Sequence, residues 1–187
     1  MKGFTTYYLE MTTPSALRGT KESPGLQVLE CEIKQFQLNR FMYQLVGQGW
    51  DWTDKNPWSD DQWIAYAEND KLRTWVGYYR GSPAGYFELQ QVECDTEIGS
   101  FGLAPAFIGK GFGGYLLSRA LECAWGWQGT QRVWVHTCTS DHPHALGNYK
   151  ARGMTLYRIN DGVSRAGPNP SRLPDPMRRS ESAGLDR

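Results

Sequence analysis

The sequence lacks the features that mark several broad classes of protein. No apolar run approaches the roughly 20 residues that a membrane-spanning helix needs, and the N-terminal stretch MKGFTTYYLEMTT has no apolar signal-peptide core. Lysine and arginine together number 20, as do aspartate and glutamate, so no basic excess favours binding to nucleic acid or to an anionic membrane. We therefore expect a cytoplasmic protein whose partners include neither nucleic acid nor a membrane.

Cysteine is also sparse and has no informative pattern. The four cysteines are scattered, without a C-x-x-C pair and without the spacing of metal ligands. We interpret them as reduced and mostly buried thiols, and we expect no metal site.

The 187 residues that are present fit one domain with a sizeable core. Apolar and β-branched runs predict strands at 4–11, 73–79, 84–89, 96–103, 132–138 and 154–159. Helical spacing and capping patterns predict helices at 32–46, after Ser59, from near Gly111, and after Asp141 or His142. This order predicts an α/β (α+β) domain over residues 1–160, with a mixed, mostly antiparallel sheet flanked by helices. The polar, proline-rich residues 161–187 predict a disordered tail.

The stretch FIGKGFGGYLL, residues 107–117, places four glycines at the start of an apolar helix. Each glycine raises the entropic cost of ordering the chain, so we infer that a ligand approaches this backbone. Free N–H groups at a helix start bind anions, phosphate above all. Gly109, Gly111 and Gly114 also match the dinucleotide pattern G-x-G-x-x-G. A nucleotide-dependent oxidoreductase, or a close turn without any ligand, therefore stays open as an alternative.

The wider segment LAPAFIGKGFGGYLL resembles the acetyl-CoA motif Q/R-x-x-G-x-G/A of the GNAT acyltransferase superfamily. The resemblance covers about residues 75–157, and Ile108 stands where that family prefers Gln or Arg. It implies that backbone N–H groups of the glycine segment hold the diphosphate of acetyl-CoA, and that the end of the preceding strand pairs with the pantetheine arm. The residues implied are Gly109, Lys110, Gly111, Phe112, Gly113 and Gly114 for the diphosphate, and Phe101, Gly102 and Leu103 for the arm.

A second stretch, HPHALGNYKARGM, resembles the family pattern N-x-x-A-x-x-x-Y-x-x-x-G-F. Ala145, Tyr149 and Gly153 are in register, with His142 in place of Asn and Met154 in place of Phe. Together the two matches imply an N-acetyltransferase that moves the acetyl group of acetyl-CoA directly to a primary amine in a ternary complex. GNAT proteins often dimerise, so a homodimer is a further expectation. A CoA-binding module without catalysis remains an alternative.

The expected chemistry needs an acid for the leaving thiolate and a base for the amine. Tyr149 matches the family's general acid. Glu97, at the start of the strand before the glycines, and His136, near the middle of the next strand, both occupy places where family members carry a base. Histidine titrates near neutral pH. Glu97, His136 or a water activated by one of them therefore stays open as the base.

The segment GWDWTDKNPWSDDQW, residues 49–63, interleaves tryptophans with aspartates. Aromatic faces and carboxylates both attract a cationic amine. We hypothesise that Trp50 and Trp52, with nearby aspartates, recognise an ammonium-bearing acceptor. The alternative is that the tryptophans fill the domain while the aspartates are solvated.

Overall fold

The computed structural model describes residues 3–20, 25–50 and 52–163. Within them the chain forms one seven-stranded sheet in the order β2-β3-β4-β5-β6-β1-β7, together with four α-helices. The strands are β1 Gly3–Met11, β2 Gln27–Glu30, β3 Leu72–Tyr79, β4 Ser82–Val92, β5 Asp95–Leu103, β6 Arg132–Cys138 and β7 Thr155–Val163. The helices are α1 Phe36–Gly47, α2 Asp60–Ala67, α3 Phe112–Gly126 and α4 Ala145–Ala151.

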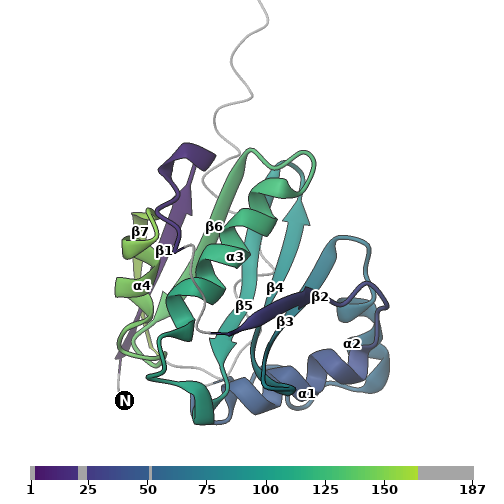
Figure 1. Cartoon of the computed structure of the whole chain (residues 1–187). Helices are drawn as coiled ribbons and strands as arrows, with labels where there is room; N and C mark the ends of the chain where they lie inside the picture. Colours follow the sequence, from purple (N-terminus) through teal and green to yellow (C-terminus); the bar gives the residue numbers. More distant parts are fainter. Residues whose placement is uncertain (1–2, 21–24, 51, 164–187) are drawn as a thin grey trace, which may run out of the picture.

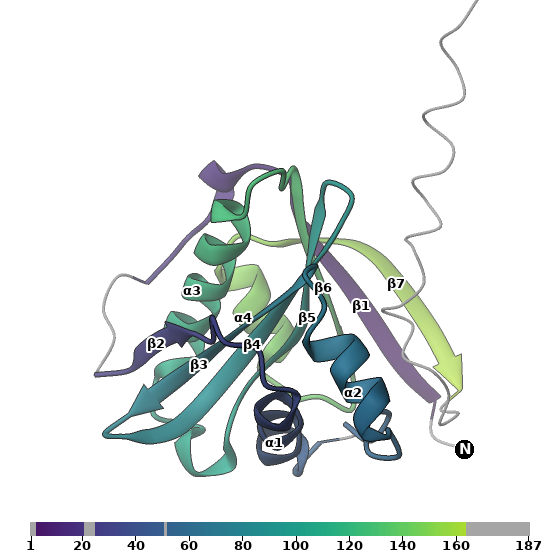
Figure 2. The same cartoon turned by 90° about the vertical axis from the view of Figure 1, so that its right-hand side faces the viewer.

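Helices cover both faces of this sheet. Figures 1 and 2 together show α3 and α4 on one face and α1 and α2 on the other. β5 and β6 run parallel, whereas the other neighbouring strands are antiparallel. The predicted α/β fold with a mixed, mostly antiparallel sheet is therefore confirmed.

The apolar residues of α3, the helix predicted after the glycines, pack on the sheet and form much of the larger core. Leu116, Leu117 and Leu121 are fully buried there. Complete burial of one such side chain contributes roughly 1.5–3 kcal/mol. A second, smaller cluster lies between the sheet and helices α1 and α2, with Met42, Trp63 and Tyr86 among its members. The polar row described below lies in this second layer.

The N-terminal strand β1 does not pair with the strand that follows it in the chain. It lies between β6 and β7 and is antiparallel to both. Its register places Tyr8 opposite His136 and Phe4 opposite Gly162. One neighbour of His136 in the sheet thus comes from the first residues of the chain.

Several predicted boundaries are wrong, for local reasons. β2 has four residues at the sheet edge, of which none is fully buried, so it gave no apolar pattern. α1 begins at Phe36 rather than 32, because the backbone of Gln35 is extended. α4 begins after His144, because Asp141 instead accepts hydrogen bonds from Thr137 Oγ1 at 2.7 Å and Cys138 N at 2.9 Å.

The predicted disordered tail is also wrong at its start. Residues 161–163 continue β7, and Thr5 Oγ1 donates a 2.8 Å hydrogen bond to Asp161 there. The remainder of that prediction, residues 164–187, lies outside the described residues. In the described part of the chain, no helix is long and apolar enough to cross a membrane.

Candidate active site

The site opens where β5 and β6 separate. These strands pair only where Asp95–Glu97 faces Arg132–Trp134. Beyond that point β5 stays with β4, and β6 stays with β1. Gly99 forms a bulge in β5, because Glu88 of β4 faces Ser100 while the next residue, Leu89, already faces Ile98. The separation opens a cavity of about 1000 Å³.

Parts of the chain that are far apart in sequence line this cavity. They are the end of β5, the glycine segment, the second half of β6, α4 with the residues before it, the start of β1, and the loop between α1 and α2. The predicted site residues among the lining are Trp50, Trp52, Phe101, Gly102, Leu103, Gly109, Gly111, Gly113, Gly114, His136 and Tyr149. The structure therefore brings most of the predicted site together.

Two glycines with positive φ angles line the cavity. Gly109 and Gly111 have φ angles of +80° and +81°, which side-chain-bearing residues rarely adopt. A Cβ added at either position would meet nothing within 4 Å, so packing does not require glycine there. The conformation requires it, and open space adjoins the backbone.

Gly111 is also the N-cap of α3. No side chain caps this helix, and its first turn contains no acidic residue. The first N–H groups of a helix have no partner inside it and carry a partial positive charge. The glycine segment therefore fits an anion such as a diphosphate.

Two of the predicted cofactor-binding residues do not line the cavity. Phe112 is 2% exposed and packs in the core beside Tyr79, with ring centroids 5.0 Å apart. The ammonium of Lys110 lies 5.2 Å from the centre of the Phe107 ring. Their side chains therefore do not form the cradle, and the role of their backbone N–H groups stays a prediction.

Tyr149 lies on α4 and faces the separated end of β5. Its ring centroid is 6.0 Å from that of Phe101, and the residue is 5% exposed. Burial raises the pKa of the Tyr149 hydroxyl, and the charge of Asp141 raises it further. The hydroxyl therefore keeps its proton and stays neutral.

Glu97 and His136, the two alternatives for the base, are neighbours across β5 and β6. His136 Nδ1 lies 3.5 Å from Glu97 Oε1, and within the described chain neither atom has a hydrogen-bond partner. His136 lines the cavity, whereas Glu97 is 3% exposed and does not line it. Burial raises the pKa of Glu97, and His136 and Lys55 oppose that rise. The two side chains thus form a pair in which the imidazole borders the cavity and the carboxyl lies deeper in the protein.

A buried polar row continues from this pair on the same face of the sheet. Glu88, on β4, is 1% exposed and accepts hydrogen bonds from Asn39 Nδ2 at 2.7 Å and Tyr66 Oη at 2.7 Å. Asn39 Nδ2 also donates to Thr74 Oγ1 at 2.8 Å. Since Asn39 and Tyr66 occupy both oxygens of Glu88, this row holds α1 and α2 on the sheet.

The loop between α1 and α2 forms one wall of the cavity. Trp52 packs against the rings of Tyr43 and Tyr86, with centroids 5.5 and 6.4 Å away. Trp50 reaches across to His142, with ring centroids 5.1 Å apart. Both tryptophans thus line the cavity, and their recognition of an ammonium-bearing acceptor stays a prediction. Trp52 also packs inside the domain, which agrees with the alternative.

The aspartates of this loop are partly engaged within the protein. Asp54 Oδ1 accepts a 2.5 Å hydrogen bond from Tyr43 Oη, and Asp60 pairs with Arg40 at 2.7 Å. Asp51 lies outside the described residues. Lys55, which the sequence analysis did not single out, also lines the cavity and is buried.

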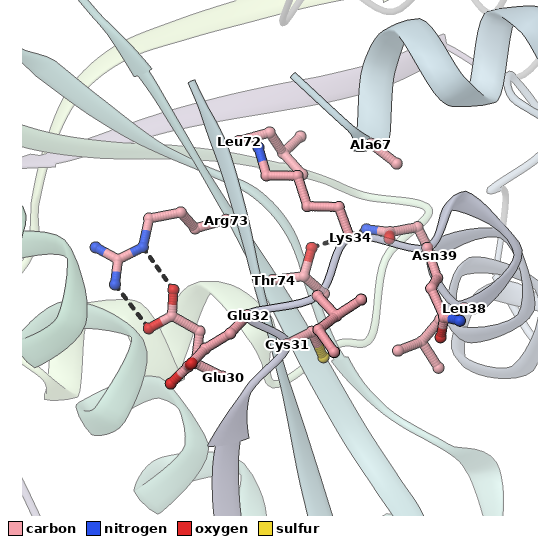
Figure 3. Close-up of a pocket in the computed structure, with 12 residues that line it drawn as sticks. Glu30, Cys31, Glu32, Lys34, Leu38, Asn39, Ala67, Leu72, Arg73 and Thr74 are labelled. Carbon is pink, nitrogen blue, oxygen red and sulfur yellow. Dashed lines mark hydrogen bonds and ion pairs between the residues drawn. The ribbon is translucent and has the colours of Figure 1, made fainter. Parts of the chain in front are cut away.

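A second hollow, shown in Figure 3, lies where β2 leads into α1 and has a volume of about 50 Å³. Arg73 donates two hydrogen bonds to Glu30 there, at 2.7 and 2.6 Å. Burial raises the pKa of the Cys31 thiol, and Glu30 adds to the rise, so the thiol stays protonated. The hollow is too small for a cofactor and contains no activated nucleophile.

The sequence profile of the Acetyltransferase (GNAT) family matches residues 34–154. The chain belongs to this family. The matched residues run from just before α1 to the end of α4, so they include the glycine segment, Glu97, His136 and Tyr149. A comparison with curated proteins gave no match.

Solved structures share the fold at low sequence identity. A GCN5-related N-acetyltransferase from Sphaerobacter thermophilus is 14% identical with a TM-score of 0.64, over 89% of this chain and 55% of that one. Another from Kribbella flavida is 14% identical with a TM-score of 0.60, over 87% and 61%. A tandem GNAT protein from the clavulanic acid biosynthesis pathway is 16% identical with a TM-score of 0.54, over 90% and 55%. This chain thus spans between 55% and 61% of the length of these proteins.

Proposed function

We propose that this protein is an N-acetyltransferase that moves the acetyl group of acetyl-CoA directly to a primary amine, both being bound at once. The observation that carries the proposal is the single cavity at the separation of β5 and β6. It joins an anion-binding helix start, a neutral buried tyrosine and a histidine backed by a carboxyl. Acetyl-CoA would supply the activated acetyl group as a thioester.

Binding of the nucleotide end would fall to the backbone of the glycine segment. The N–H groups from Gly109 to Gly114 lie at and just before the first turn of α3. The N-terminus of a helix favours negative charge. Between Ile98 and Leu103, β5 has no strand neighbour on its β6 side among the described residues. The N–H and C=O groups on that side can hydrogen-bond the amide groups of an extended arm, as in strand addition.

His136 would take the proton that the acceptor ammonium must lose, because it is the member of the pair that reaches the cavity. Glu97 would orient the imidazole and stabilise its protonated form from behind. Glu97 is therefore a positioning residue in this scheme. Tyr149 would donate its proton to the leaving thiolate from the other side of the separation.

Calorimetric titration with acetyl-CoA, with NADH as comparator, tests the cofactor half of this proposal. Acetyl-CoA should bind and NADH should not. CoA release with a panel of amines tests the catalytic half. Binding of NADH alone would point to the oxidoreductase alternative, and acetyl-CoA binding without turnover of any amine would point to the non-catalytic module.

Separate His136→Gln and Glu97→Gln variants test the roles within the pair. A positioned base contributes about 10²–10⁴-fold, so His136→Gln should lower kcat at least about 100-fold and abolish the acidic limb of the pH–rate profile. Glu97→Gln should keep that limb but shift it, with a smaller loss. A limb that disappears only in Glu97→Gln would make Glu97 the base.

A further inference from the structure

Lys55 is a buried charge in the cavity that the proposed mechanism does not use. It lies in the loop between α1 and α2, and its side chain is 4% exposed. Among the described residues that line the cavity, no other is a lysine or arginine. A buried ammonium is costly unless its surroundings compensate for lost hydration.

Aromatic rings provide most of that compensation. Lys55 Nζ lies 4.8 Å from the centre of the Tyr43 ring, 5.1 Å from that of Tyr66 and 5.6 Å from that of Trp58. Each contact attracts the cation by roughly 0.5–2 kcal/mol. Ring faces hold the charge in place, but they are poor hydrogen-bond acceptors for its three N–H groups.

Asp54 balances the charge without completing these hydrogen bonds. Its Oδ2 lies 3.8 Å from Lys55 Nζ, which is beyond hydrogen-bond length. Its Oδ1 accepts the hydrogen bond from Tyr43. Although the Asp54 side chain is 28% exposed, its Oδ2 is buried and has no hydrogen-bond partner within the described chain. Within the described chain, Lys55 Nζ makes no hydrogen bond.

Lys55 and His136 line the same cavity. The charge of Lys55 is close enough to Glu97 to lower the pKa of that carboxyl, against the larger effect of burial. Glu97 in turn lies 3.5 Å from His136. An acceptor with its amine at His136 can therefore present another part of the same molecule to Lys55.

We propose that Lys55 binds a carboxylate of the acceptor, so that the substrate class is amines that carry a carboxylate, such as amino acids. The proposal rests on the proposed function for the position of the reacting amine. Hydrogen bonds between an ammonium and a carboxylate are about twice as strong as neutral ones, and this cavity offers the ammonium fixed and without a hydrogen-bond partner. The rings of Tyr43, Trp58 and Tyr66 then hold the cation of the protein itself.

The test compares amino acids with their carboxamides as acceptors, measured by CoA release. The wild type should prefer the acid to the amide. Lys55→Met, which keeps length and removes charge, should lower kcat/KM for the acids roughly ten- to a hundredfold, as expected for loss of a charged hydrogen bond. It should lower kcat/KM for the amides much less than for the acids, because loss of the Lys55 charge acts on Glu97 equally for both acceptors, and it should leave the KM for acetyl-CoA unchanged. Lys71→Met is the matched control, because Lys71 is exposed and does not line the cavity.

An equal loss on acids and amides in Lys55→Met, or a wild type that does not prefer the acid, would overturn the proposal. The wild-type comparison needs no variant, so a Lys55→Met protein that fails to fold does not remove the test. If no amine releases CoA, the proposed function is what has failed. N-acetylglycine and N-acetylglycinamide, titrated calorimetrically into both proteins, then decide the inference. Binding of the acid to the wild type alone supports it, and equal binding of both compounds contradicts it.

Discussion

The glycine segment gives the sharpest quantitative test, through the substitution Gly111→Ala. The added methyl group meets no protein atom within 4 Å, so it causes no steric clash inside the protein. The φ angle of +81° remains, and a side-chain-bearing residue in the left-handed region costs about 1–2 kcal/mol. Alanine also restricts the unfolded chain, which stabilises the folded state by about 0.4–1 kcal/mol. The net loss of unfolding free energy should be about 1 kcal/mol.

For a domain of this size, that loss lowers Tm by about 2–4 °C. The effect on acetyl-CoA should be larger, because the methyl group occupies the open space beside the first N–H groups of α3. Loss of one hydrogen bond to a charged group costs about 1.5–3 kcal/mol. We therefore expect acetyl-CoA to bind roughly ten- to a hundredfold more weakly, measured by calorimetry below the lowered Tm.

Gly81→Ala is the matched control. Gly81 lies in the turn between β3 and β4, has a φ angle of +82°, and an added Cβ there also meets nothing within 4 Å. It does not line the cavity. Gly81→Ala should lower Tm by a similar amount and leave acetyl-CoA binding unchanged. Equal acetyl-CoA affinities in the two variants would refute the assignment of Gly111 to the phosphate cradle.

Two further outcomes follow from buried groups of the site. Tyr149→Phe should lower kcat by about 100-fold or more, because a general acid contributes about 10²–10⁴-fold. The KM for acetyl-CoA should not change. An unchanged kcat would exclude Tyr149 as the general acid. The raised pKa of Glu97 means that the folded protein binds this proton more tightly than the unfolded chain does. The wild type therefore loses stability as pH rises above the ordinary glutamate pKa of about 4.3. The Tm of Glu97→Gln relative to the wild type should increase between pH 4 and pH 8, and a constant difference would contradict this account.

The sequence predicted what local patterns determine. The glycine segment, the apolar residues of α3 and the capping box of Ser59 with Gln62 each lie within a few residues, and all three are found. β2 was missed because a four-residue edge strand buries too little to leave an alternating pattern. The place of β1 was not predictable, because its pairing depends on strands from the other end of the chain.

The arrangement of the site depends on the same long-range pairing. Glu97 and His136 were rival candidates for the base, and the parallel register of β5 with β6 makes them neighbours. Lys55 was overlooked because a lysine among tryptophans and aspartates normally belongs to a solvated loop. Trp52 and Trp58 stand three residues to either side of Lys55, but α1 and α2 must pack before the rings of Tyr43 and Tyr66 surround its ammonium.

The position of β1 also sets an order for folding. During synthesis this strand is made first, but its two neighbours, β6 and β7, are made last. Until then both of its edges present unpaired N–H and C=O groups, which can pair with other strands. Contacts between such distant parts of a chain form slowly, because the entropy of closing a long loop is lost before the contacts stabilise the fold. His136 faces Tyr8 in the pairing of β1 with β6, so His136 gains its neighbour on this side only after a strand from each end of the domain has formed.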